Sequence, residues 1–490
     1  MKSRKPFVRS LATLALIAAI VLVSPTISAA ADEDFYVKPY VQLGDNPKLE
    51  AAESEEVAWF VRSPQRHWQL EIKQDGGDWT SAPVSIRSKE IFGAPVTPLY
   101  QYICTIRGLK PGTLFDYRVL ADDKPIFAAW AKVRKSLDEP FVCDIFGDCG
   151  SGSLGEKLIA WQCYQQPLPD FVLIPGDIVY PSGLFSEYMR YFFPVYNNDN
   201  VDLMRGVPLM RSIPFMCALG NHDVSQDTGY PANLKKHPDA LAYFAIWRPP
   251  LNGPQTKTDM SNIPKFQGPE PVCKRFLQSV GDQYPRSGMY SFDFGNSHWL
   301  VLDADFYMNW TDPALRSWVE KDLTETKARW KFVAFHQPGF SCDNHHWQEQ
   351  RMRVLSDVFQ RCGVDVIFCG HAHDYQRTHP IRFTANRKDG EMFVKKDGTV
   401  PGEISLDTKF DGEHVTVPNG VIEIVTGAGG AALYPERRKF AAGGTGGDVI
   451  DKFISNTHSF SRCKISADKF ELWQIDTNGK PVDHFVVTKK

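Results

Sequence analysis

The hydrophobic pattern of the chain changes near residue 138. Residues 35–137 alternate short β-rich runs with turn residues, as in EEVAWFVR and WQLEIKQDGGDWTS. Short runs of this kind predict an all-β sandwich of about 100 residues. Residues 138–490 instead combine longer apolar runs with stretches of helical periodicity. That alternation predicts a second domain with α/β architecture.

The apolar runs of the second domain have the length and composition of buried strands, and helices are predicted between them. Helices are predicted at 154–165, at 313–329, where Pro313 lies in the first turn, and at 352–362, where Gly363 ends the helix. No internal repeat is visible. The predicted strands are FVCDIF, FVLIP, FMCALG, HWLVLD, KFVAF, VDVIFCG and VIEIVTG.

Polar residues follow five of these predicted strands at the point where each strand ends. Sites in α/β sheets lie at the carboxyl ends of strands, so the five segments can converge on one cleft. In the last segment His371 and His373 are two residues apart, which places both imidazoles on one side of an extended backbone. Imidazole nitrogens bind zinc, iron and manganese. The segments are Gly147–Gly150, Gly176–Tyr180, Gly220–Asp223, His336 and Gly370–His373.

The order of these segments, GDxG, GDxxY, GNH, H and GHxH, resembles the calcineurin-like metallophosphoesterase superfamily. Tyr180 makes the chain similar to the purple acid phosphatases of the larger, two-domain type. The resemblance implies a ferric ion and a divalent iron, zinc or manganese ion, bridged by Asp177. Carboxylate and phenolate oxygens suit a trivalent ion, while imidazole and a neutral amide leave the second ion more Lewis acidic. The implied ferric ligands are Asp148, Tyr180 and His373, and the implied ligands of the divalent ion are Asn221, His336 and His371.

The same resemblance assigns three further histidines to the substrate. His345 and His346 follow His336 in SCDNHHWQ, and His222 belongs to the GNH motif. In larger members of the family these positions contact the substrate rather than the metals. Histidines near a phosphate can neutralise its charge and protonate the leaving alkoxide. His222, His345 and His346 are therefore the expected catalytic and substrate-binding residues.

The resemblance extends over most of the chain. The run TIRGLKPGTLFDYRVL resembles a fibronectin type III domain, and the terminal FSRCKISADKFELWQIDTNGKPVDHFVV is also similar to the larger phosphatases. The implied architecture is a fibronectin type III-like β-sandwich at 35–137, which packs or docks, followed by an α/β metallophosphoesterase sandwich at 138–490. In the second domain, helices are expected to flank mixed sheets.

Four positions depart from the family pattern. Asp223, Asp374 and Gln376 stand where alanine or glutamate is common, and none of them is an expected ligand. Cys149 lies inside the first motif, where a thiol beside a ferric ligand could make the site redox sensitive.

Segment 386–419 is polar and turn-rich and is expected to be a surface excursion.

These expectations combine into a secreted acid phosphatase that hydrolyses phosphate monoesters by attack of a metal-bound hydroxide on phosphorus, with an acidic pH optimum. The main alternative is a phosphodiesterase or nucleotide pyrophosphatase on the same scaffold, because pocket walls set substrate choice. A non-catalytic metal-binding protein is a third hypothesis. GSGSLG at 150–155 with Asp170 also matches a dinucleotide-binding fingerprint, but that hypothesis leaves Asp148 and the later motifs unexplained.

Residues 1–31 have the pattern of a secretory signal, with four basic residues, an apolar run at 11–23 and small residues at 28–31. Without them the chain has 51 basic and 58 acidic residues, a net charge of about −7, which argues against a nucleic-acid partner. No later segment approaches 18 uninterrupted apolar residues, so no stable membrane insertion is expected. The expected location is extracellular or periplasmic, and the expected partners are small phosphorylated substrates.

The 10 cysteines include no CxxC pair, so a zinc ribbon or thioredoxin motif is not supported. Cys143, Cys217 and Cys369 lie in apolar runs and are expected to be core thiols. Export permits disulfides among the others, for example between Cys342 and Cys362. The sequence leaves open the physiological substrate, the divalent metal and the oligomeric state.

Overall fold

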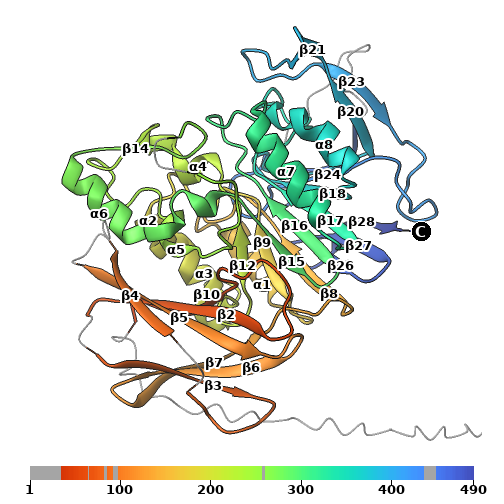
Figure 1. Ribbon diagram of the computed structural model, residues 1–490. Coiled ribbons are helices and arrows are strands. Elements are labelled where there is room, and N and C mark those ends of the chain that lie inside the picture. The colour runs from red at the N-terminus through yellow and green to blue at the C-terminus, as the bar shows by residue number, and fades with distance from the viewer. Residues whose placement is uncertain are drawn as a thin grey trace, which may run out of the picture.

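The computed structural model describes residues 35–63, 66–81, 85–91, 98–256, 260–434 and 449–489. The predicted signal at 1–31 lies outside the described residues. Figure 1 shows a small all-β sandwich, in red and orange, beneath a larger α/β body whose elements run from yellow to blue. The predicted fold class, a β-sandwich followed by an α/β sandwich, is confirmed.

The N-terminal sandwich consists of two antiparallel sheets, with strand orders β1-β2-β5-β4 and β3-β6-β7. Trp68, Leu70 and Ile72 alternate along β3 and all lie in the core between the sheets, as the two-residue period of a strand requires. Trp59 stacks on Tyr102 in the same core, with ring centroids 5.7 Å apart. The strands are β1 Val37–Gln42, β2 Glu53–Val61, β3 Trp68–Gln74, β4 Ser85–Ile91, β5 Leu99–Leu109, β6 Leu114–Ala121 and β7 Lys124–Lys132.

The α/β domain is built from two mixed sheets. One has the strand order β12-β9-β8-β26-β27-β28, and the other β15-β16-β17-β18-β24-β19-β25. Strands β8, β9 and β12 are parallel in the first sheet, and β16, β17, β18 and β24 are parallel in the second. The bounds are β8 Phe141–Ile145, β9 Phe171–Ile174, β12 Phe215–Cys217, β15 Tyr290–Phe294, β16 Ser297–Val301, β17 Trp330–Ala334, β18 Val366–Cys369, β19 Tyr375–Thr378, β24 Ile422–Thr426, β25 Ile450–Ile454, β26 Ser459–Ile465, β27 Lys469–Asp476 and β28 Pro481–Thr488.

An aromatic core lies between these two sheets. The Trp299 ring, on β16, is 4.4 Å from Phe332 and 5.3 Å from Phe171, so it connects the second sheet to the first. Every residue of β9, β12, β16 and β18 is buried. Strands covered on both faces read as continuous apolar runs, which explains why the sequence predicted them without alternation.

Helix α1 packs against the first sheet, and helices α7 and α8 pack against the second. Ser153 caps α1 by accepting a hydrogen bond from Glu156 N, and Asp312 caps α7 by accepting one from Ala314 N. Both helices end two to four residues before their predicted ends, and the helix predicted at 352–362 is split into a 3₁₀ turn and α8. Within the described part of the chain no helix is long and apolar enough to cross a membrane. The helices are α1 Leu154–Cys163, α2 Phe185–Glu187, α3 Phe193–Tyr196, α4 Asn221–Val224, α5 Tyr243–Ile246, α6 Glu270–Val280, α7 Pro313–Glu325 and α8 Ser356–Arg361.

Segment 386–419 is the surface excursion that its polar composition predicts. It continues from a two-stranded ribbon of β20 and β23, and a smaller hairpin of β21 and β22 follows. Figure 1 shows these strands projecting beyond α8. The short strands of the domain are β10 Asn197–Asp202, β11 Gly206–Pro208, β13 Ala232–Asn233, β14 Phe266–Gln267, β20 Ile381–Ala385, β21 Arg387–Lys388, β22 Glu391–Met392 and β23 Gly402–Leu406.

Buried polar contacts fix the N-terminal sandwich to the α/β domain. Tyr40 OH donates to Ile246 O at 3.0 Å. Arg134, in the segment after β7, is buried with its partner Glu53, to which its Nε donates at 3.0 Å. Its Nη1 donates to Asp293 O, on β15, at 3.1 Å. The first domain is therefore packed against the second.

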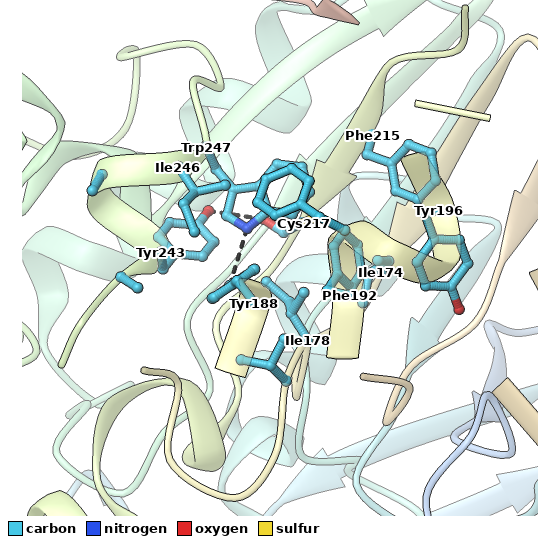
Figure 2. Packing of buried hydrophobic residues seen from close by; sticks show 14 of the residues in the cluster. Ile174, Ile178, Tyr188, Phe192, Tyr196, Phe215, Cys217, Tyr243, Ile246 and Trp247 are labelled. Atoms are coloured by element: carbon cyan, nitrogen blue, oxygen red, sulfur yellow. Dashed lines mark hydrogen bonds between the residues drawn. The ribbon is translucent and has the colours of Figure 1, made fainter. Parts of the chain in front are cut away.

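A cluster of aromatic side chains supports the strand ends of the first sheet. Figure 2 shows these rings around Ile174, the last residue of β9. Trp247 Nε1 donates to Tyr188 OH at 3.1 Å, and Tyr243 OH donates to Cys217 O, at the end of β12, at 2.9 Å. Because such interiors are close-packed, the ends of β9 and β12 have little freedom to move.

The cysteines follow the predicted pattern only in part. Cys143, Cys217 and Cys369 are buried core thiols, as expected. Cys342 and Cys362, both in the described part of the chain, are not joined by a disulfide. The Cys362 sulfur faces the α7 backbone instead, 3.9 Å from Glu320 O, so the suggested pairing is wrong.

Candidate metal centre

The five polar segments meet at one edge of the α/β domain. Asp148 follows β8, Asp177 follows β9 and Asn221 opens α4 after β12, all in the first sheet. His336 follows β17 and His371 follows β18, in the second sheet. Because each set of strands is parallel, the carboxyl ends of both sheets deliver their side chains to the same place.

Three of these side chains start from left-handed backbone. The φ angle is +57° at Asp148, +51° at Asp177 and +69° at His371, a conformation that costs a non-glycine residue about 1–3 kcal/mol. A Cβ at Gly370 would lie 2.5 Å from Asp148 Oδ2, and one at Gly220 would lie 2.3 Å from Asp177 Oδ1. The glycines of the GH and GN pairs therefore let neighbouring polar side chains approach closely.

Asp148, Tyr180 and His373 form one half of the cluster. Tyr180 OH lies 3.1 Å from Asp148 Oδ1, 3.1 Å from Asp177 Oδ2 and 3.1 Å from His373 Nε2. His373 Nδ1 donates to Ala432 O at 2.7 Å, which leaves the lone pair of Nε2 directed at the phenol. One phenolic proton cannot serve three acceptors, so the arrangement fits a cation held by oxygen and imidazole ligands.

Asn221, His336 and His371 form the other half. His336 Nδ1 donates to Pro175 O at 2.9 Å, so its Nε2 lone pair faces inward. That Nε2 is 3.1 Å from Asn221 Oδ1 and 3.2 Å from Asp177 Oδ2. It is also 3.2 Å from His371 Nδ1. Asp177 Oδ2 therefore faces both halves, in the position of a bridging ligand.

Burial sets the protonation of the cluster. It raises the pKa of Asp148 and of Tyr180 well above their ordinary values, because an anion is costly without a countercharge. It lowers the pKa of His371 and of His373 to about 4. Neutral imidazoles, together with buried oxygens that ionise only beside a positive charge, are a donor set that metal ions complete. The residues present therefore fit a two-metal centre.

His222 lies beside the first half of the cluster. Its backbone N donates to Asp177 Oδ1 at 2.9 Å, and its Nδ1 donates to Pro181 O at 2.6 Å. Its ring is 4.4 Å from the Tyr180 ring and keeps 23% of its side-chain surface exposed. The free side of this imidazole is thus available to a ligand above the cluster.

His346 lies beside the second half, together with Glu349, which the sequence analysis missed. The His346 ring is 4.0 Å from the His371 ring. Glu349 Oε1 lies 3.1 Å from His346 Nδ1, and its Oε2 lies 3.4 Å from His371 Nε2. Burial alone would raise the pKa of Glu349, but the hydrogen bonds with His346 and His371 lower it. These three residues form a further group of potential metal donors.

Tyr434 is a second residue that the sequence did not reveal. Its ring stacks on His373 at 4.2 Å and lies 4.5 Å from His345 and 5.8 Å from His346. Its backbone N donates to His373 O at 3.0 Å. Tyr434 therefore connects the metal-binding segment with the histidine pair, although it lies far beyond the last motif and no spacing in the sequence pointed to it.

Comparison with known proteins agrees with this geometry. The sequence pattern of the calcineurin-like phosphoesterase family matches residues 144–375. That span contains all the predicted ligands, from Asp148 to His373. This chain belongs to the calcineurin-like phosphoesterases. Membership of this family implies bound metal ions.

Relatives of this phosphoesterase include purple acid phosphatases. Purple acid phosphatase 21 of Arabidopsis thaliana is 31% identical over 235 residues, 46% of this chain and 42% of that protein. An uncharacterized protein of Mycobacterium tuberculosis is 24% identical over 373 residues, 68% of this chain and 60% of that protein. The match thus spans less than two thirds of either relative. The structure of a purple acid phosphatase from yellow lupin has the same fold, with a TM-score of 0.62 at 16% identity, covering 92% of this chain and 74% of that one.

Two of the departures from the family pattern have structural explanations. The Asp223 carboxylate accepts hydrogen bonds from Gly220 N at 2.9 Å and from Ile178 N at 3.3 Å, so it ties two ligand segments of the phosphoesterase together. Cys149 is fully buried, and burial raises the pKa of its thiol well above the ordinary value. A buried, protonated thiol is unreactive, so the redox sensitivity suggested for Cys149 is wrong.

The glycine-rich segment 150–155 leads into α1 and does not form a dinucleotide site. Ser153 Oγ, within it, donates to Gly430 O at 2.6 Å. Asp170 precedes β9 and accepts from Val142 N at 2.9 Å and from Lys132 Nζ at 2.8 Å. It therefore lies at the opposite end of the strand from the ligand cluster, and the dinucleotide hypothesis is wrong.

Proposed function

We propose that this phosphoesterase is an acid phosphatase that hydrolyses phosphate monoesters at a dinuclear Fe(III)–M(II) centre, where M is iron, zinc or manganese. The observation that carries the proposal is the position of Asp177 Oδ2, 3.1 Å from Tyr180 OH and 3.2 Å from His336 Nε2. One carboxylate oxygen between two donor sets is what a pair of adjacent metal ions requires.

When bound, the two metals supply Lewis acidity and a water-derived nucleophile at low pH. The protein determines which ion each half holds. Asp148 and Tyr180 offer anionic oxygens to one ion, which favours a trivalent metal. Asn221 and His336 offer neutral donors to the other ion, which favours a divalent metal with affinity left for a phosphoryl oxygen.

The three histidines are proposed to hold the phosphate and to protonate the leaving alkoxide. His222 lies on the Tyr180 side of the cluster, His346 lies on the His371 side, and His345 lies beside Tyr434, which stacks on His373. A phosphate above Asp177 would therefore meet an imidazole on both sides. Positioned acids of this kind contribute ~10²–10⁴-fold to the rate.

The substrate class is tested by initial rates on a chromogenic phosphate monoester and its matching diester from pH 4 to 9, with metal-replete protein. Faster monoester hydrolysis with an optimum below neutral is expected. Replacing His345 and His346 together by Ala should then lower kcat/KM by ~10²–10⁴-fold. His414→Ala is the matched control, because this histidine is 80% exposed on the surface excursion. Preference for the diester would favour a phosphodiesterase, and hydrolysis of neither would favour a metal-binding protein.

We also propose that the protein is exported, on the basis of the signal pattern at 1–31. N-terminal analysis of the protein recovered from the medium or periplasm of its host tests this. A chain that begins near residue 32 is expected. A cytosolic protein that retains residue 1 would contradict export without affecting the proposed reaction.

A further inference from the structure

The backbone of the histidine pair is fixed by one carboxylate. His345 N and His346 N both donate to Asp343 Oδ1, at 2.7 and 2.8 Å. Asp343 is fully buried, and Ser341 Oγ donates to its other oxygen at 2.7 Å. Because one side chain holds both amides, the place of Asp343 sets where the two imidazoles stand.

Gln376, on β19, holds this turn in place. Its Nε2 donates to Ser341 Oγ at 2.9 Å, and its Oε1 accepts from Cys342 N at 2.8 Å. Its Nε2 also donates to Asp374 Oδ1 at 2.9 Å. Gln376 is fully buried, and the Cys342 N–H identifies which end of the amide is the oxygen. Both amide hydrogens and the oxygen of this side chain are therefore in use.

This connection joins the two parts of the site. Strand β19 follows His371 and His373 directly, and it is paired on one side with β24 and on the other with β25. The segment that carries two predicted metal ligands is thus hydrogen-bonded to the loop that carries His345 and His346. Because β19 is hydrogen-bonded to a strand on each side, it gives that loop a rigid point of attachment.

Only an amide satisfies these partners. Ser341 Oγ gives its one hydrogen to Asp343, so from residue 376 it can only accept. A glutamate would accept from Cys342 N but could donate nothing to Ser341, and its charge would face Asp374. The two departures from the family pattern at Asp374 and Gln376 therefore form one hydrogen-bonded unit.

We infer that Gln376 is a positioning residue for the phosphate-binding histidines. Through Ser341 and Asp343 it sets where His345 and His346 stand relative to the metal centre. The kinetic consequence rests on the proposed phosphatase function. The structural consequence, an ordered turn at 341–346, does not depend on that function.

Hydrogen exchange of the metal-replete full chain, read by mass spectrometry, tests the structural consequence. In Gln376→Leu and in Ser341→Ala, peptides covering 341–349 should exchange ~10-fold faster than in wild type. Gln474→Leu is the matched control, because Gln474, on β27, is equally buried. It is hydrogen-bonded to Ser461 at 2.6 Å and to Ser459 at 2.8 Å, both on the neighbouring strand β26. It should leave exchange at 341–349 unchanged. If Gln376→Leu and Ser341→Ala also leave it unchanged, the inference is overturned.

Steady-state kinetics test the consequence for catalysis. Gln376→Leu should lower kcat/KM for the monoester by ~10–100-fold, the range found for residues that orient metal-site groups, with metal content unchanged. In a His345→Ala/His346→Ala background it should have no further effect, because nothing remains to be positioned. The inference would be overturned if Gln376→Leu lowered kcat/KM further in the His345→Ala/His346→Ala background. A normal kcat/KM in Gln376→Leu despite faster exchange would also overturn it. A wild-type protein without phosphatase activity would instead contradict the proposed function. Hydrogen exchange alone would then test whether Gln376 orders the turn at 341–346.

Discussion

The α/β domain contains two buried ionic clusters made of the same residue types. In the first, His336 Nε2 lies 3.1 Å from Asn221 Oδ1, 3.2 Å from Asp177 Oδ2 and 3.2 Å from His371 Nδ1, so one ring nitrogen faces three potential acceptors. In the second, the ring nitrogens of His298 lie 2.6 Å from Asp293 and 2.7 Å from Asp322. With His298 protonated, each of its N–H groups has a carboxylate acceptor. The second cluster is a closed ion triplet, and the first is an open set of donors.

The difference lies in protonation. Burial alone would lower the pKa of His298, but its hydrogen bonds to Asp293 and Asp322 outweigh burial and raise it. In the first cluster, the charge of Asp177 outweighs burial and raises the pKa of His336 to about 10, but burial lowers the pKa of His371 and His373 to about 4. A histidine that stays cationic stabilises the fold, and a histidine that stays neutral offers a lone pair to a metal. The neutral imidazoles of His371 and His373 thus distinguish the candidate metal centre from the ion triplet.

The largest effect is expected when the Asp177 carboxylate is removed from the first cluster. Asp177→Ala removes the one oxygen that faces both halves, so turnover of a phosphate monoester should fall more than ~1000-fold, the loss of two-metal chemistry. Steady-state rates on metal-replete protein measure this, with Asp322→Ala as the matched carboxylate control. Near-normal turnover of Asp177→Ala would show that both clusters are structural.

The next effect concerns the second cluster and should appear in stability rather than activity. Asp322→Ala leaves the buried His298 with one carboxylate, so the free energy of unfolding should fall by about 3 kcal/mol, the cost of breaking a buried ion pair. Ser291 Oγ also loses its acceptor. Urea unfolding measures the change. Loss of metal or activity in a folded Asp322→Ala protein would contradict the separation of the two clusters.

The pH dependence of stability gives a smaller effect. Because the folded-state pKa of His298 is raised, its stabilisation is complete below the unfolded-state value and is lost as pH rises through the folded-state value. The loss is about 1.4 kcal/mol for each unit between the two values. Asp293 also faces Lys48 at 3.6 Å. Urea unfolding from pH 6 to 9 should show wild type losing stability relative to His298→Gln, and parallel pH profiles would contradict the ion triplet.

The smallest effect is expected at the N-terminus of α7, the helix that carries Asp322 nearer its C-terminal end. Asp312→Ala removes the N-cap of α7, which should lower the free energy of unfolding by about 1 kcal/mol. Metal content and kcat/KM should stay at wild-type values. A change in either would mean that loss of stability alone perturbs the metal centre. The effects measured for Asp177→Ala and Asp322→Ala would then have to be corrected for their loss of stability.

The strand ends that carry the candidate ligands could be predicted from sequence because each is a local pattern. A buried apolar run, a glycine and a polar residue identify Asp148, Asp177, Asn221 and His371 without knowledge of the fold. The C-terminal strands were not recognised in the same way. Along β27 buried and half-buried residues alternate, as in an antiparallel strand with one covered face, and this pattern differs from the continuous apolar runs of the parallel strands.

The connections around the site could not be predicted, because they depend on tertiary contacts. Tyr434 contacts His373 across a long sequence separation, and Gln376 reaches Ser341 from another strand. The reactivity of the Cys149 thiol also depends on its burial, which the motif around it does not reveal. Motifs therefore predicted the candidate donors, and only the fold shows which side chains contact them.

The most direct test of the central claim is metal stoichiometry by elemental analysis of wild type, Asp148→Ala and Asn221→Ala after loading with iron and zinc. Each variant removes a donor from only one half of the cluster. About two ions per chain are predicted for wild type and about one for each variant, with iron lost from Asp148→Ala and zinc from Asn221→Ala. A wild-type chain that binds no metal or one ion, or variants that both keep two, would contradict a dinuclear centre at these residues.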